Sequence, residues 1–216
     1  MKTDSALQRD ALDELKYEPR VDHSHIGVTA KDGVVTLTGF VPDYSQKICA
    51  EKAVRRVSGV KAIAQDIEVR FASDPKTSDP EIAGRILNIL AWDVTLPGDG
   101  IKVKVEHGWV TLTGTVDWQY QRRAAAKATG RIAGVKGVSN LVEVRVQPAT
   151  ADVRDRIVAA FKRSSLLDAN SINVAVEGGT VKLSGRVHGW NERKVAETAA
   201  WAAPGVSKVE DNIVFA

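Results

Sequence analysis

The chain contains three copies of one glycine-bounded stretch, of which Gly108-Trp-Val-Thr-Leu-Thr-Gly-Thr-Val116 is the middle one. The other two copies are Gly33-Val-Val-Thr-Leu-Thr-Gly-Phe-Val41 and Gly179-Thr-Val-Lys-Leu-Ser-Gly-Arg-Val187. A further Gly-Val pair follows twenty residues after the second glycine of each, at Gly59-Val60, Gly134-Val135 and Gly205-Val206. This spacing predicts three tandem units, called copy 1, copy 2 and copy 3 in chain order.

Composition limits the classes of function. With 30 Lys and Arg against 27 Asp and Glu, the net charge is only +3. No block of five or six like charges occurs, which disfavours a nucleic-acid partner. The apolar runs fall well short of the roughly 18 residues that span a bilayer. No secretory signal opens the chain, so we expect a cytoplasmic protein, or a periplasmic one if a leader was removed. Cys49 is the single cysteine, so no internal disulfide is possible.

Each copy opens with apolar residues at helical spacing, which predicts a first helix. Asp4 or Ser5, Asp79 and Thr150 stand where a helix N-cap is expected. The apolar positions are Leu7, Ala11, Leu12 and Leu15 in copy 1, Ile82, Ile86, Leu87 and Leu90 in copy 2, and Val153, Ile157, Val158 and Phe161 in copy 3.

Two alternating apolar runs follow, joined by Asp-Gly, His-Gly or Gly-Gly, and they predict a β-hairpin. The second glycine of the repeated pattern lies inside the second strand, which indicates a bulge or a close approach of a helix. A second helix with small inward residues begins near Asp43, Trp118 and Asn191, and one more strand follows it.

The predicted fold class is therefore α+β. Each unit reads α-β-β-α-β, with two helices covering one face of a small three-stranded mixed sheet. The predicted domains span residues 1–71, 79–146 and 150–216, joined by linkers over residues 72–78 and 147–149.

The glycine frame, together with the strand ends Gln65-Asp66-Ile67 and Asp211-Asn212-Ile213, resembles the BON domain. This bacterial module is named for an osmotically induced periplasmic protein and nodulation proteins. The resemblance covers nearly the whole chain. It implies a membrane-associated, phospholipid-binding module without catalytic residues, of a kind found in envelope-stress proteins, secretins and channel-associated proteins. The chain departs from the commonest pattern in having three copies and no signal peptide.

Basic and aromatic residues gather at the start of each second helix. Lys47, Arg122 and Arg193 occupy equivalent positions there. Cations at a helix N-terminus oppose the helix dipole, so local helix stability does not require them. Beside Trp and Tyr they suit an anionic lipid interface, where each basic residue contributes about 1 kcal/mol. The alternative is an ordinary solvated helix face. The lipid-binding candidates are Tyr44, Lys47, Trp118, Tyr120, Arg122, Arg123, Lys127, Trp190, Arg193 and Lys194.

Three further tryptophans, Trp92, Trp109 and Trp201, are candidates for contacts with a partner or between domains. His23 and His25 lack a Cys or acidic partner at ligand spacing, so no metal site is expected. We find no pattern typical of a nucleophile with its base, so the chain is not expected to be an enzyme, and no cofactor is implied.

The sequence thus predicts a non-catalytic binding module that associates with anionic phospholipid or membrane surfaces in a stress- or envelope-related role. The alternative is a soluble protein-interaction scaffold of three rigid domains, which could form a homo-oligomer.

Overall fold

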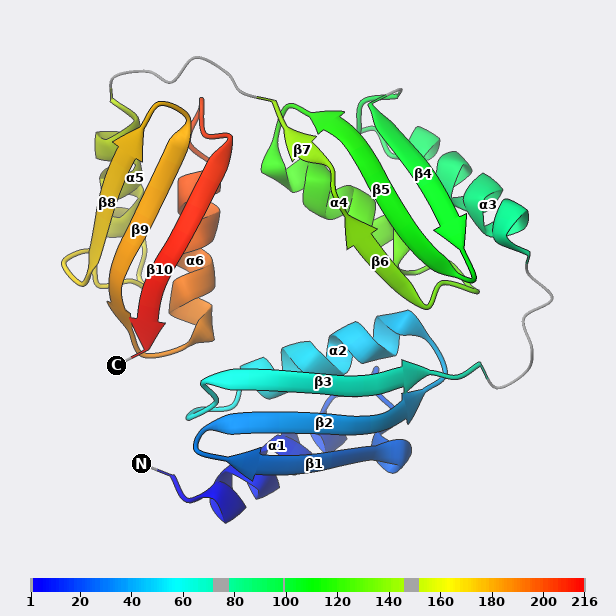
Figure 1. Cartoon of the computed structure of the whole chain (residues 1–216). Coiled ribbons are helices and arrows are strands. Elements are labelled where there is room, and N and C mark those ends of the chain that lie inside the picture. Colours follow the sequence, from blue (N-terminus) through cyan, green and yellow to red (C-terminus); the bar gives the residue numbers. More distant parts are fainter. Residues whose placement is uncertain (1, 72–77, 99, 146–151, 216) are drawn as a thin grey trace. The chain divides into compact units, whose positions relative to one another are not determined.

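A computed structural model of the chain describes residues 2–71, 78–98, 100–145 and 152–215. It contains the predicted α-β-β-α-β order three times, and in each copy both helices lie on one face of the sheet (Figure 1). The α+β prediction is confirmed. Copy 1 contains α1 (Asp4–Tyr17), η1 (His23–His25), β1 (Ile26–Lys31), β2 (Val34–Val41), α2 (Tyr44–Arg55) and β3 (Ala62–Val69).

Copy 2 contains α3 (Asp79–Trp92), β4 (Ile101–Glu106), β5 (Trp109–Val116), α4 (Gln119–Thr129), β6 (Gly137–Asn140) and β7 (Glu143–Val144). Copy 3 contains α5 (Val153–Arg163), β8 (Ile172–Glu177), β9 (Thr180–Val187), α6 (Trp190–Trp201) and β10 (Lys208–Phe215). The linker residues 72–77 and 147–149 and the predicted cap Thr150 lie outside the described residues.

The repeated glycine stretch forms the central strand of each sheet. In copy 1, β2 pairs antiparallel with β1 and parallel with β3, and copy 3 repeats this with β9 between β8 and β10. The parallel register is the same in every copy. Val34 pairs with Ala62, Trp109 with Gly137 and Thr180 with Lys208, a difference of 28 positions each time. The spacing of the glycines along the sequence therefore corresponds to one fixed strand register.

Copy 2 departs from the predicted three strands, because its last strand is divided into β6 and β7. Both pieces pair with β5 in the same register, and the amide of Leu141 between them still donates to the Leu112 carbonyl at 2.8 Å. The interruption therefore divides one strand without shifting it.

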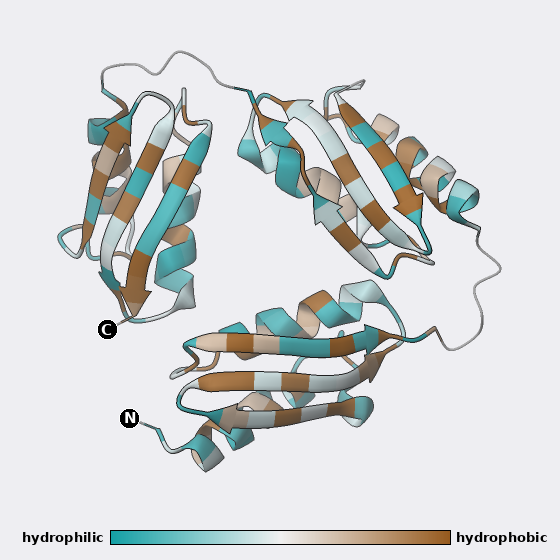
Figure 2. Cartoon of the chain, viewed as in Figure 1, coloured by the Kyte–Doolittle hydropathy of each residue, from teal (hydrophilic) through white to brown (hydrophobic). Residues whose placement is uncertain are grey.

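Alternation along the strands places one side of each sheet in a core (Figure 2). In copy 1, Val35 and Leu37 from the central strand are fully buried together with Ala50 and Ala53 of α2. Small residues on the second helix let its backbone lie close to the sheet, as their spacing predicted. Equivalent side chains are buried in the other copies, among them Val110, Leu112, Val181, Leu183, Ala196 and Ala200.

The glycines of the frame lie at two close backbone contacts in each copy. The Gly33 carbonyl accepts from the amide of Lys61 at 2.8 Å, and Gly108 and Gly179 accept equivalent bonds from Lys136 and Ser207 at 2.9 Å. The second glycine approaches the backbone that precedes the first strand: a Cβ on Gly39 would lie 1.9 Å from the His25 carbonyl oxygen. The close approach is thus to backbone at the start of the hairpin, whereas a bulge or a helix was predicted.

The helix caps also differ from the prediction by one residue. Thr3 and Ser78 are the N-caps of α1 and α3, and Ser78 donates its amide to Glu81 at 2.9 Å. Asp79 instead accepts the amides of His107 and Gly108 at 2.7 and 2.9 Å. These bonds lower the pKa of the Asp79 carboxyl. The aspartate therefore fixes the hairpin turn to the helix.

Replacing Leu112 by alanine should unfold copy 2 near room temperature. Leu112 is fully buried, and its truncation costs about 2–5 kcal/mol. A domain of this size has only about 3–5 kcal/mol of stability. Hydrogen exchange measured by mass spectrometry should show residues 79–145 exchanging as a unit. A protection pattern equal to that of the unchanged chain would contradict this.

Gly185→Ala should destabilise copy 3 by at least about 2 kcal/mol, because its φ is +133° and the new Cβ would meet the Ser171 carbonyl oxygen at 2.0 Å. Gly189→Ala is the matched control, since its φ is −170° and no atom lies within 4 Å of the added Cβ. Urea denaturation should separate the two variants, and equal midpoints would refute the explanation.

Candidate functional site

Lys47, the first of the predicted lipid-binding cations, has an internal partner. Its ammonium donates to the carbonyl of Ile67 in β3 at 2.7 Å, and Gln65 donates its side-chain amide to the Lys47 carbonyl at 3.1 Å. These two bonds fasten the first turn of α2 to the neighbouring parallel strand. The cation therefore has a structural use despite its unfavourable place at a helix N-terminus.

Arg193 occupies the same position in copy 3, and there its internal partner is charged. Its Nε donates to the Asp211 carboxylate at 2.7 Å, and both side chains are largely buried. Its guanidinium lies 5.6 Å from the Trp190 ring centroid and 5.7 Å from that of Phe215. The two rings themselves pack at 5.0 Å. The aromatic and basic residues predicted to meet lipid here form a cluster with β10.

The remaining members of the predicted site differ in exposure. Tyr120, Lys127 and Lys194 are exposed on α4 and α6. Tyr44, Trp118, Arg122 and Arg123 are partly buried. The ten candidates are thus distributed over the second helices of three copies, and their lipid binding stays a prediction.

The three tryptophans predicted to contact a partner or another domain have different surroundings. Trp92, at the end of α3, is 86% exposed. Trp109 is also exposed, but its ring covers Gly137 on the adjacent strand, where a Cβ would lie 2.2 Å from it. Trp201 packs against the core of its own copy. Of the three, Trp92 is therefore the one least buried within its own copy.

The surroundings of Trp92 contain further exposed apolar side chains that the sequence did not reveal as a site. Ile89 stands one turn earlier on the same helix face, and Val94, two residues beyond the helix, is 98% exposed. We call Ile89, Trp92 and Val94 the α3 patch. Leu87, predicted to face inward, is 51% exposed, because it lies about 100° around the helix from buried Ile86.

The α3 patch has little charge around it. Between Ile82 and Trp92 the one charged side chain is Arg85, seven residues before Trp92 and so on the same face. Asp93 adjoins the patch, but its carboxylate accepts from the Thr95 amide at 3.0 Å and from the Thr95 hydroxyl at 2.6 Å. An amphipathic helix end with one cation and a tryptophan is typical of a surface that meets an apolar or interfacial partner.

Copy 1 has a network of ion pairs at the corresponding end of its first helix. Glu18 accepts from Arg20 at 2.8 Å and from Arg56 at 3.2 Å, while Arg56 also pairs with Glu14 at 2.8 Å. The hydrogen bond from Arg20, and then that from Arg56, lower the pKa of the buried Glu18 to about 2. The network bridges α1 and the end of α2, so its role is structural.

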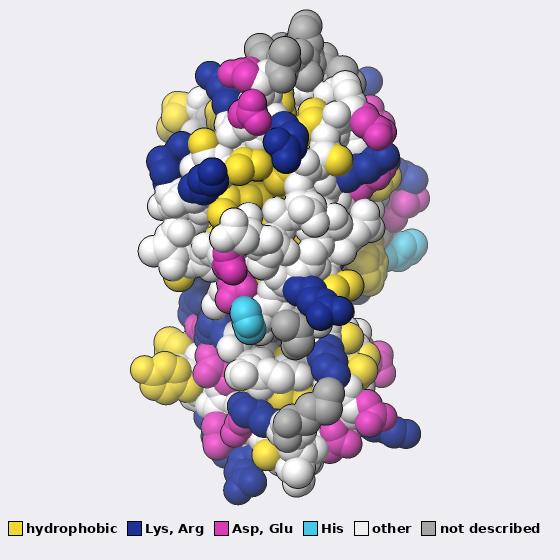
Figure 3. Space-filling view, turned by 90° about the vertical axis from the view of Figure 1, so that its left-hand side faces the viewer, with side chains coloured by type: hydrophobic (Ala, Val, Ile, Leu, Met, Phe, Trp, Pro, Cys, Tyr) yellow, Lys and Arg dark blue, Asp and Glu magenta, His cyan; other side chains and the backbone are white. Residues whose placement is uncertain are grey.

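The described part of the chain shows no candidate metal cluster. Residues 2–71, 78–98, 100–145 and 152–215 hold no group of three or more metal-ligand side chains. His25 instead stacks on Phe40, with ring centroids 4.4 Å apart. The helices described here are all too short or too polar to cross a membrane. Basic and acidic side chains are interspersed on the face shown in Figure 3.

Comparison with known proteins identifies the repeated unit. The BON domain family model matches residues 3–70, 78–146 and 149–216. The osmotically-inducible protein Y of Escherichia coli (strain K12) is 31% identical over 141 residues, which are 63% of this chain and 70% of that protein.

Two solved structures of CdsD, a structural protein of the type III secretion system of Chlamydia trachomatis, also match. The first is 16% identical, covers 98% of this chain and 92% of its own, and has a TM-score of 0.27. The second, a C-terminal domain, is 15% identical, covers 97% of each chain and has the same TM-score. At this level the likeness carries no argument about function.

Arg193→Ala should lower the stability of copy 3, because it removes a charged hydrogen bond worth about 1.5–3 kcal/mol and leaves the largely buried Asp211 carboxylate without its cation. Lys194→Ala is the matched control, since Lys194 is the exposed neighbour on the same helix. Thermal unfolding should show a lower midpoint for the first variant only. Equal midpoints would mean that the internal pair contributes nothing measurable.

Proposed function

The chain belongs to the BON domain family, and from that premise we propose that it is a non-catalytic module that associates with anionic phospholipid surfaces. A stress- or envelope-related role is supported by its similarity to a relative named for osmotic induction.

The α3 patch is the observation that carries this proposal. Trp92 and Val94 are almost fully exposed, so their insertion at a membrane surface would bury apolar area that water now contacts. Tryptophan is enriched at such interfaces, where its amphipathic ring sits at the level of the headgroups. The exposed Arg85 lies on the same helix face, where its charge would meet the headgroups.

Basic residues elsewhere would add electrostatic attraction. Lys127 and Lys194 are exposed members of the predicted lipid-binding set, and each such residue near an anionic surface contributes about 1 kcal/mol. Lys47 and Arg193 are assigned no part in this proposal, because their side chains are bound within their own copies. Because the α3 patch and Lys127 both belong to copy 2, copy 2 is the proposed membrane-facing copy, and Lys194 of copy 3 would add only electrostatic attraction.

A protein-interaction scaffold is the second candidate, and exposed residues on the uncovered sheet face of copy 2 support it. Trp109 lies on β5 and Leu141 lies in the interruption between β6 and β7, and both are exposed. A partner seated on this sheet would contact a surface other than the α3 patch. The two functions are therefore separable by mutation.

Trp92→Ser/Val94→Ser should weaken binding to anionic vesicles by at least about tenfold, since each buried apolar side chain contributes about 1.5–3 kcal/mol. The matched control is Tyr17→Ser, at the aligned position of copy 1, where the side chain is 83% exposed. Co-sedimentation with phosphatidylglycerol-containing vesicles, at low and at physiological salt, measures both variants.

Unchanged pelleting of the double variant would exclude the α3 patch, and no pelleting of the unchanged chain would exclude membrane association. The pair Arg122→Glu/Arg123→Glu tests the basic start of α4 in the same assay. If only this pair loses binding, the lipid site lies at the predicted corner rather than on α3.

A further inference from the structure

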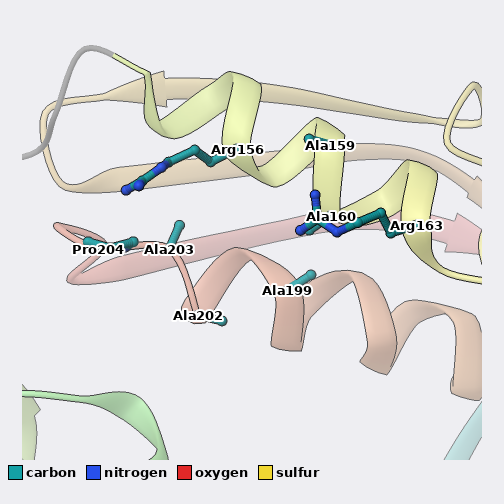
Figure 4. Close-up of a pocket in the computed structure, with 8 residues that line it drawn as sticks. All are labelled: Arg156, Ala159, Ala160, Arg163, Ala199, Ala202, Ala203 and Pro204. Carbon is teal, nitrogen blue, oxygen red and sulfur yellow. The ribbon is translucent and has the colours of Figure 1, made fainter.

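A groove lies between α5 and α6 of copy 3 (Figure 4). Its volume is about 330 Å³. The lining consists of alanines and one proline, with an arginine at each of two positions on α5. The residues are Arg156, Ala159, Ala160, Arg163, Ala199, Ala202, Ala203 and Pro204. We call this the alanine groove.

The groove is open because two bridging side chains of copy 1 are absent from copy 3. In copy 1, Glu14 of α1 pairs with Arg56 at the end of α2 at 2.8 Å. The residues aligned with them in copy 3 are Ala160 and Ala202, both in the groove lining. Replacing the ion pair by two methyl groups removes the bridge between the helices and leaves an apolar floor.

Two guanidinium groups border this floor. Arg156 and Arg163 are seven residues apart, so they share one face of α5, about 10 Å apart along its axis. Arg156 pairs with Asp152 at 3.2 Å, with both side chains about half exposed. Within residues 152–215 no carboxylate forms an ion pair with Arg163. In Figure 4 both side chains extend along the space between the helices.

We propose that the alanine groove binds a single-chain alkyl carboxylate, with the alkyl chain on the alanine floor and the carboxylate at Arg163. Arginine presents paired N–H donors that match both oxygens of a carboxylate. The same fold in copy 1 uses carboxylate–guanidinium pairing at this level, which Glu14 and Arg56 supply internally. In copy 3 both members of that pair are alanines, and Arg163, at the position aligned with Tyr17, supplies a different guanidinium at the groove. The carboxylate then comes from the ligand.

The size of the groove favours one alkyl chain. A volume near 330 Å³ is at the lower end of the range of about 300–1,000 Å³ for small-molecule sites. A two-chain phospholipid would exceed it. An acyl chain and anionic group presented by a bilayer share the ligand's chemistry, so the experiment compares dissolved ligand with vesicles. The groove is in copy 3, so this inference does not depend on the proposed membrane contact of copy 2.

The test is titration of the full, ¹⁵N-labelled chain with decanoate below its micelle concentration. Saturable amide shifts are expected in residues 157–164 and 198–206, on both sides of the groove. Decanol and decyltrimethylammonium, which have the same chain but no anionic group, should produce no saturable shifts there. Equal responses to all three compounds would overturn the assignment of Arg163 as the carboxylate partner.

Ala160→Glu/Ala202→Arg is the decisive variant, because it rebuilds across the groove the pair that copy 1 contains. It should retain the fold and lose decanoate binding by at least about tenfold. Arg163→Ala should lose about tenfold, the effect of removing one charged hydrogen-bonding partner. Lys162→Ala, an exposed neighbour outside the lining, is the matched control and should bind as the unchanged chain does.

Unchanged affinity in Ala160→Glu/Ala202→Arg, confirmed as folded by its amide spectrum, would overturn the proposal. Binding to anionic vesicles separates the two sources of ligand. If this variant loses vesicle binding while the unchanged chain shows no response to dissolved decanoate, the groove takes membrane lipid and the free-ligand proposal is wrong. If it loses decanoate binding alone, the proposal holds whatever the fate of the α3 patch.

Discussion

One backbone hydrogen bond in each copy ties the hairpin to the second helix and the last strand. The residue that follows the Gly-Val pair donates its amide to the carbonyl of the first glycine. The bond joins Lys61 to Gly33 at 2.8 Å in copy 1 and recurs in both other copies. A side chain on the first glycine would meet backbone here, as the 2.7 Å approach of a Cβ on Gly108 to the Gly134 carbonyl oxygen shows. This contact sets where the last strand begins beside the central strand, and so sets the parallel register. The position of the second helix and the enclosure of the core follow from that register. Because backbone makes it, the side chains around it are free to differ between copies.

The sequence predicts the elements that depend on backbone geometry, but not the side-chain contacts that form only in the folded chain. Glycine spacing and apolar periodicity are local signals, so the helices, the hairpins and the α-β-β-α-β order were all predictable. Helix caps were displaced by one residue, because Asp79 is used by a turn almost thirty residues away. The partners of Lys47 and Arg193 were not predictable, since both lie on a strand that only the folded register brings near. Leu87 was misplaced because apolar character alone does not give the helix face.

Three aligned positions on one stripe of the first helix carry different kinds of side chain in the three copies. In copy 1 the stripe holds Asp10, Glu14 and Tyr17, and Glu14 bridges to the second helix. In copy 2 the aligned residues are Arg85, Ile89 and Trp92, which form an exposed apolar end beside a cation. In copy 3 they are Arg156, Ala160 and Arg163, which border a groove. One scaffold thus presents an ion-paired, an apolar and a cationic surface at equivalent places, so a function particular to one copy can be sought on this stripe.

The shared register of 28 positions has a cost during folding. Each last strand offers its neighbours the same ladder of donors and acceptors, so backbone alone does not distinguish the central strand of its own copy from those of the others. Copy-specific side-chain pairs supply the distinction. Asp211 receives Arg193 in copy 3, whereas Gln65 stands at the aligned place in copy 1 and donates to the carbonyl of Lys47. The last strand of copy 1, placed beside α6 of copy 3, would present Gln65 to Arg193 in place of the Asp211 carboxylate. In copy 3 the charged pair therefore favours the strand of the same copy.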